Sequence, residues 1–153
     1  MLKKLMQTDE DVGMLIVRLT LGLVMFPHGA QKLLGWFGGN GFAGTLQFFT
    51  SQMGLPAVVA LLVLLVESFG AISLITGFLG RVSAFGILGV MLGAIFMVHL
   101  PNGFFMNWYG NQNGEGYEYH LLAIGMALAI LVKGSGSLSI DRSMSDKERR
   151  TYR

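Results

Sequence analysis

The chain has 153 residues, of which 52% are hydrophobic and only 13% are charged, against roughly 25% charged in soluble domains. Its formal net charge of +2 is too small to indicate binding to nucleic acid. The absence of cysteine excludes disulfides, thiol relays and iron–sulfur ligation by this chain, so any redox chemistry would need a bound cofactor or a partner protein.

Four apolar stretches follow one another along the chain, at about 12–34, 55–78, 82–100 and 117–133. A bilayer core about 30 Å thick needs ~20 predominantly apolar residues in a helix, so each stretch is of spanning length. The sequence therefore predicts an all-α, polytopic membrane four-helix bundle over residues 1–134, followed by a flexible cytoplasmic tail over residues 135–153. These spans leave no room for a soluble catalytic domain.

The first stretch carries three ionisable side chains, Arg18, His28 and Lys32. Arg18 lies ~9 Å past the start of the stretch, at ~1.5 Å per residue. His28 and Lys32 are four residues apart near the other end, so they share one face of the helix.

A short amphipathic helix is predicted in the loop after the first stretch. Phe42, Leu46, Phe49 and Met53 recur there at helical spacing, with polar residues between them. Such a pattern is typical of a helix that lies on the membrane surface.

Glu67 interrupts the second stretch ~18 Å from its outer start, and so ~12 Å from the inner side of a ~30 Å core. This depth agrees with that of Arg18, and an unpaired charge there costs about 2.5–3.5 kcal/mol. We therefore predict an intramembrane ion pair between Arg18 and Glu67. Two interpretations of the pair stay open: it holds the bundle together, or its carboxylate accepts protons or anchors a polar ligand.

The third stretch carries Gly89 and Gly93, a small-residue spacing that predicts close helix packing within the molecule. His99 lies at its outer end, and Glu118 and His120 open the fourth stretch. All three histidines of the chain thus fall near one outer level, together with Lys32 and Glu118.

This outer group, His28, Lys32, His99, Glu118 and His120, is the candidate ligand or proton site. The histidines could hydrogen-bond a quinone head group or accept protons from the outer side. A metal is the less favoured ligand, because Lys32 adds positive charge and no compact metal-binding spacing is present. A purely structural role, in which the histidines satisfy loop backbone groups, is the third alternative.

The basic residues predict the orientation. The two long loops, 35–54 and 101–116, contain no Lys or Arg. The positive-inside rule therefore places both termini and the middle turn in the cytoplasm and the long loops outside. The basic residues that set this orientation are Lys3, Lys4, Arg81, Lys133, Arg142, Lys147, Arg149, Arg150 and Arg153.

The order of these residues resembles the DoxX family of bacterial membrane proteins. The first span contributes Arg18, Gly22, Phe26, His28-Gly29 and Lys32, and the matching positions with charged or aromatic side chains beyond it are Glu67, Arg81, His99, Glu118 and Tyr119. The resemblance implies a multi-pass protein of the bacterial inner membrane. It also implies a link to redox processes, since some relatives are tied to thiosulfate:quinone oxidoreductase or to complexes that handle oxidative and thiol stress.

Three functional hypotheses follow. The first is a quinone-linked or redox-complex-associated membrane subunit, with quinone as the cofactor that the outer site would hold. The second is a non-enzymatic membrane scaffold for a soluble redox partner. The third is a small proton-coupled transporter with Glu67 as its relay, which four spans without an inverted repeat disfavour unless the chain forms a homodimer.

Overall fold

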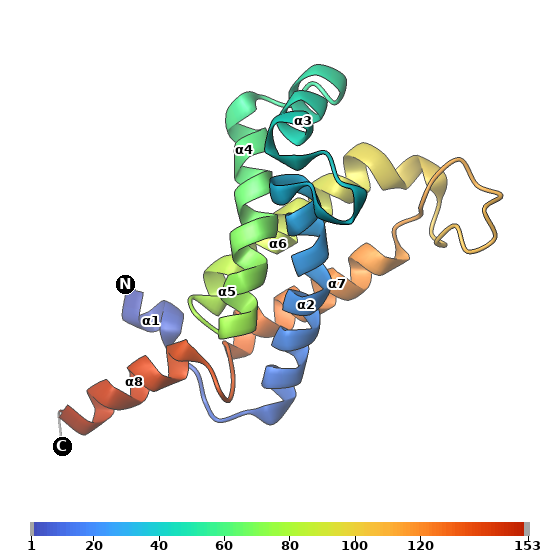
Figure 1. Cartoon of the computed structure of the whole chain (residues 1–153). Helices are drawn as coiled ribbons and strands as arrows, with labels where there is room; N and C mark the ends of the chain where they lie inside the picture. The colour runs from blue at the N-terminus through green and yellow to red at the C-terminus, as the bar shows by residue number, and fades with distance from the viewer. Residues whose placement is uncertain (1, 152–153) are drawn as a thin grey trace.

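The computed structural model describes the backbone of residues 2–151 and the side chains of residues 4–145 (Figure 1). This part of the chain is all helical and contains no strand. In chain order the elements are α1 (Leu2–Met6), α2 (Val12–Leu34), η1 (Trp36–Gly38), α3 (Gly41–Gln47), η2 (Phe48–Gln52), α4 (Ala57–Leu65), η3 (Val66–Gly70), α5 (Ala71–Thr76), α6 (Gly80–Ala94), η4 (Ile95–His99), η5 (Leu100–Asn102), α7 (Glu118–Lys133) and α8 (Ile140–Thr151). Of these, η2, η3 and η4 are π-helical, and η1 and η5 are 3-10 helices.

Three of the described helices are long and apolar enough to cross a membrane: Val12–Leu34, Ala57–Thr76 and Gly80–Asn102. They confirm the predicted all-helical membrane class at nearly the predicted positions. The fourth predicted span corresponds to α7, which has 16 residues and packs against α6 and α2. Its crossing of the membrane stays a prediction.

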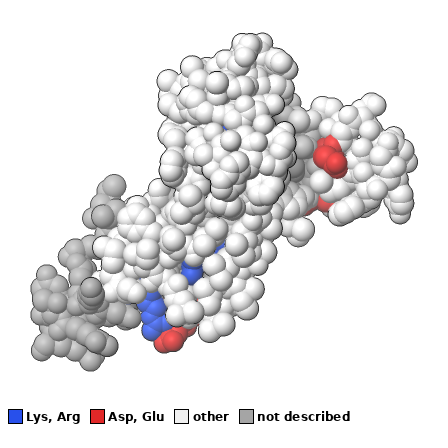
Figure 2. Space-filling view, in the orientation of Figure 1, with Lys and Arg blue, Asp and Glu red and all other residues white. Residues whose placement is uncertain are grey.

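The core lies where α2, α5, α6 and α7 meet. Leu21, Leu74, Ile87 and Ile130 are fully buried there, and alanines such as Ala127 bring the helix backbones close together. The opposite faces of these helices are also apolar and are exposed, which indicates a lipid environment. Figure 2 shows a face with few charged side chains, on which Lys and Arg lie towards the end that holds the termini.

The helices α2 and α4–η3–α5 run antiparallel and come into backbone contact. A Cβ on Gly22 would lie about 3 Å from atoms of Leu74 and Ile75, and one on Gly29 would lie 2.5 Å from the carbonyl oxygen of Glu67. Glu67 is therefore level with Gly29. The helix Ala57–Thr76 extends past the C-terminal end of α2, where α4 lies beside α3 (Figure 1).

A short helix stands where the sequence predicts an amphipathic one. After the glycine cap of α2 at Gly35 (φ 74°), the chain forms α3 and continues into η2. Phe49 of η2 is buried and faces the bundle, and α3 contacts both α2 and α4. A position on the membrane surface remains a prediction for this segment.

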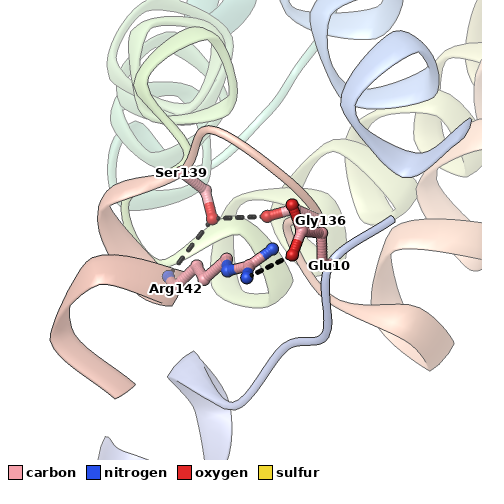
Figure 3. A network of polar contacts seen from close by, with 4 residues as sticks. All are labelled: Glu10, Gly136, Ser139 and Arg142. Atoms are coloured by element: carbon pink, nitrogen blue, oxygen red, sulfur yellow. Dashed lines mark hydrogen bonds and ion pairs between the residues drawn. The ribbon is translucent and has the colours of Figure 1, made fainter. Parts of the chain in front are cut away.

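The structure differs from the predicted flexible tail at its start, where Ser135, Ser137, Ser139 and Asp141 are buried. Ser139 Oγ donates to the Gly136 carbonyl (2.8 Å) and accepts the N–H of Arg142 (3.2 Å), while the Arg142 guanidinium pairs with Glu10 (2.7 Å) (Figure 3). These contacts fix the beginning of α8 against the segment before α2. Of the predicted tail, residues 152–153 and the side chains from 146 onward lie outside the described residues.

The start of the predicted tail is buried because Asp141 caps the N-terminus of α6. Its N-cap residue is Leu79, which offers no side-chain acceptor to the first free N–H groups of the helix. The Asp141 carboxylate accepts from the N–H groups of Leu79 (2.7 Å) and Gly80 (3.0 Å) instead, and also from Ser135 Oγ (2.5 Å). A carboxylate at a helix N-terminus is favoured by the helix dipole as well.

Candidate functional site

A cavity of about 650 Å³ lies in the half of the bundle away from the termini. This volume is within the ~300–1,000 Å³ that small-molecule sites occupy. Its walls are apolar and come from η2, α4 and α6, with Phe49, Met53, Val59, Leu62, Val63 and Val90 among them. Its polar end is formed by α2, η3, η4 and α7.

The cavity brings together four of the five residues that the sequence proposes as a ligand or proton site: His28, Lys32, His99 and His120. Glu118 is not among the lining residues. Its Oε1 accepts from the backbone N–H of Met106 (3.2 Å) and from Trp108 Nε1 (3.1 Å). Glu118 thus holds the second long loop in place.

Glu67 also lines the cavity, and its partner is Lys32. Lys32 Nζ lies 2.7 Å from Glu67 Oε2, with the two side chains 24% and 7% exposed. Glu67 belongs to the π-helical turn η3, whose wider coil changes the direction of its side chains relative to an α-helix. Ser68 Oγ donates to the carbonyl of Gly29 (3.2 Å), which holds η3 against α2.

The structure does not bring Arg18 and Glu67 together as the sequence predicts. Arg18 is 0% exposed and donates to backbone carbonyls from two segments. Its Nη1 donates to Leu74 and to Ile75 (2.7 Å) in the last turn of α5. Its Nε and Nη2 donate to the segment after α7, at Ser135 (2.8 Å), Ser137 (3.4 Å) and Leu138 (3.2 Å).

The register of the two helices explains this difference. Glu67 is level with Gly29, which lies eleven residues or ~16 Å beyond Arg18 along α2. The predicted pairing requires α4 to begin level with the C-terminal end of α2, whereas α4 begins beyond that end. Arg18 instead reaches the C-terminal carbonyls of α5, which lack helical partners and carry the negative end of the helix dipole.

Tyr119 and His120 leave polar atoms without partners at the cavity. Tyr119 Oη and His120 Nδ1 are buried and have no hydrogen-bond partner among the described residues. The His120 ring lies against that of His99, with centroids 4.1 Å apart, and His99 Nδ1 is held 2.8 Å from the Glu115 carbonyl. An unsatisfied buried polar group costs about 1–3 kcal/mol, which a bound ligand would recover.

The structure does not give Gly89 and Gly93 the role in close helix packing that the sequence predicts. Both line the cavity, and a Cβ added at either would meet no atom within 4 Å. Gly86, one turn earlier, does make a helix contact, since a Cβ there would lie 2.9 Å from a Val66 methyl. The glycines of α6 thus change from packing to open space along the helix.

Within the part of the chain that the structure describes, no group of three or more His, Asp or Glu side chains could hold a metal ion. The donors at the cavity instead suit an organic ligand with carbonyl or hydroxyl groups. Tyr119 lines the cavity but is not part of the site predicted from the sequence. A tyrosine beside a loop is equally typical of the membrane interface, so its position alone does not indicate a cavity residue. Its neighbour His120 was the available signal.

Comparison with known proteins places the chain among membrane proteins. A family model described as DoxX matches residues 13–100. "Inner membrane protein YqjF" of Escherichia coli (strain K12) is 31% identical over 142 residues, which cover 93% of this chain and 99% of the relative. "Putative oxidoreductase CatD" of Bacillus subtilis (strain 168) is 30% identical over 136 residues, 89% of this chain and 90% of the relative. No solved structure matches the chain significantly.

Proposed function

This chain belongs to the DoxX family of membrane proteins, and on that premise we propose that it is a quinone-binding subunit that works with a redox partner. One observation carries the proposal: an apolar cavity ends at two buried, unpartnered polar groups, Tyr119 Oη and His120 Nδ1. A quinone combines an apolar body with two carbonyl acceptors and so matches this arrangement. The name of the Bacillus subtilis relative, "Putative oxidoreductase CatD", supports a redox context.

The residues of the chain have separate roles in this proposal. The Tyr119 hydroxyl and His120 Nδ1, in the tautomer that protonates it, would hold the ring by donating to its carbonyl oxygens. The Lys32–Glu67 pair closes the polar end and places an ammonium group beside the cavity. A bound quinone would supply two-electron, two-proton chemistry, with the electrons delivered by the partner, because the chain has no cysteine of its own.

The proposal includes α7 as the fourth span, which completes a four-span domain over residues 1–134 with both termini in the cytoplasm. The distribution of Lys and Arg supports this orientation. The cavity then lies in the outer half of the bilayer, under α3 and η2 as an interfacial helix. A C-terminal fusion to alkaline phosphatase should be inactive, and an active fusion would reject this topology.

The test of the quinone site is Tyr119→Phe. Removing one hydroxyl should reduce quinone retention about five- to tenfold, the effect of one neutral hydrogen bond of ~1–1.4 kcal/mol. The variant should unfold no more easily than wild type, because the hydroxyl has no partner in the described structure. Native mass spectrometry of protein released from lipid nanodiscs, supplied with ubiquinone, measures retention.

Tyr117→Phe is the matched control, since Tyr117 lies outside the cavity lining and packs its ring edge-on against Phe104. It should retain quinone as wild type does. If wild type retains only phospholipid, the quinone proposal fails and the result supports the scaffold hypothesis.

A further inference from the structure

The cavity opens at the side of the bundle. Leu62 of α4 and Met97 of η4 line it, and both are also exposed at the molecular surface, by 54% and 50%. Both belong to helices long and apolar enough to span the membrane. The mouth of the cavity, where such lining residues reach the surface, is therefore apolar and suited to lipid rather than to water.

A groove connects this mouth with the polar end. The second span and α6 touch where Val66 meets Gly86, and beyond that point α4 and α6 separate (Figure 1). Gly89 and Gly93 form the α6 side of the groove, and neither has an atom within 4 Å of its Cβ position. Val59 and Val63 of α4 form the other side.

We infer that the ligand enters sideways from the bilayer between α4 and α6, and that this groove holds the first part of a long apolar tail. This inference rests on the proposed function and narrows its ligand class to long-chain isoprenoid quinones rather than small water-soluble aromatics. A tail in the groove fills space that side chains leave open at Gly89 and Gly93. The head group reaches His120, which is only 8% exposed and has an unpartnered Nδ1.

The test compares a short-chain and a long-chain ubiquinone on the same purified protein in nanodiscs. Gly89→Leu/Gly93→Leu should weaken binding of the long-chain quinone about tenfold or more, which corresponds to about 1.4 kcal/mol. Binding of the short-chain quinone should change much less, because its head group does not need the groove. Gly93→Leu alone is the milder variant, and its effect should be in the same direction.

Gly125→Leu is the matched control, because Gly125 of α7 is exposed, has open space at its Cβ position and does not line the cavity. It should bind both quinones as wild type does. Equal loss of both quinones, or no loss of either, in the glycine variants would overturn the tail groove while leaving the quinone site standing. Failure of wild type to bind either quinone would overturn the proposed function and this inference together.

Discussion

At the scale of single residues, the partner of each buried charge depends on which part of the neighbouring helix lies beside it. Arg18 lies beside the end of α5 and donates to the carbonyls there, whereas Glu67 lies beside the C-terminal part of α2 and pairs with Lys32. Arginine suits the first environment because its guanidinium has five donors in a fixed fork and no titration near neutral pH. Lysine suits the second as a compact charge on a flexible stem.

Removal of either member of the Lys32–Glu67 pair should leave the other charge without its counterion. Lys32→Met and Glu67→Leu should each lower the free energy of unfolding by about 3 kcal/mol, the low end for a buried pair, since Lys32 keeps 24% exposure. The double variant should recover about 1–3 kcal/mol of their summed loss. Denaturant unfolding in detergent micelles measures the cycle.

Lys133→Met serves as the control for this cycle, because the Lys133 side chain is exposed. Its effect should stay within about 0.5 kcal/mol. Strictly additive losses in the double variant would show that Lys32 and Glu67 act independently in solution.

At the scale of elements, the π-helical turns distinguish this bundle from four regular helices. η3 carries Glu67 and η4 carries His99, so two of the three described π turns supply polar residues to the cavity. A π turn places one extra residue in the helix and is frequent at functional sites. The backbone of α2 at Gly29 packs against η3, and Ser68 Oγ of η3 donates to the Gly29 carbonyl. These two contacts hold the π turn in place.

Gly29→Ala should separate α2 from η3. The new Cβ would lie 2.5 Å from the Glu67 carbonyl oxygen and 2.6 Å from Ser68 Cα, and both are backbone atoms that cannot rotate away. We expect a loss of about 1–3 kcal/mol, as in other overpacked cores, together with weaker quinone retention. Thermal unfolding in micelles measures the first effect. Gly125→Ala, with open space at its Cβ position, should be neutral or slightly stabilising.

At the scale of the whole molecule, Arg18 and Asp141 connect the two ends of the chain. Arg18 joins α2 to the end of α5 and to residues 135–138, and Asp141 joins the same segment to the start of α6. Arg81 acts similarly, donating to Leu131 (3.0 Å) near the end of α7 and to Leu5 (3.2 Å). The end of the bundle with the termini is therefore a polar network, and the opposite half contains the cavity.

Arg18→Met should release the segment after α7 without unfolding the rest. The carbonyls of Ser135 and Leu138 would lose their donor, so we expect amide hydrogen exchange in residues 135–139 to quicken about 100-fold, or ~2.7 kcal/mol. Arg18→Lys should give a smaller increase, because an ammonium has fewer donors. Amides of α4, far along the chain and not bonded to Arg18, are the internal reference. Uniform quickening in α4 as well would indicate global unfolding instead.

Sequence patterns alone predict the membrane class, the positions of the long helices and most of the polar side chains of the cavity. The apolar runs indicate the membrane class and the helices. The residues that interrupt or flank them, His28, Lys32, His99 and His120, indicate the polar side chains of the cavity, because polar groups are costly to bury in a membrane and are therefore rare there. The folded bundle sets which charges pair, since the axial offset of α4 against α2 is a property of packing rather than of either helix. It also determines that Glu118 serves a loop, that Gly89 and Gly93 border open space, and that Ser135–Ser139 is packed, because each depends on contacts between segments far apart in the chain.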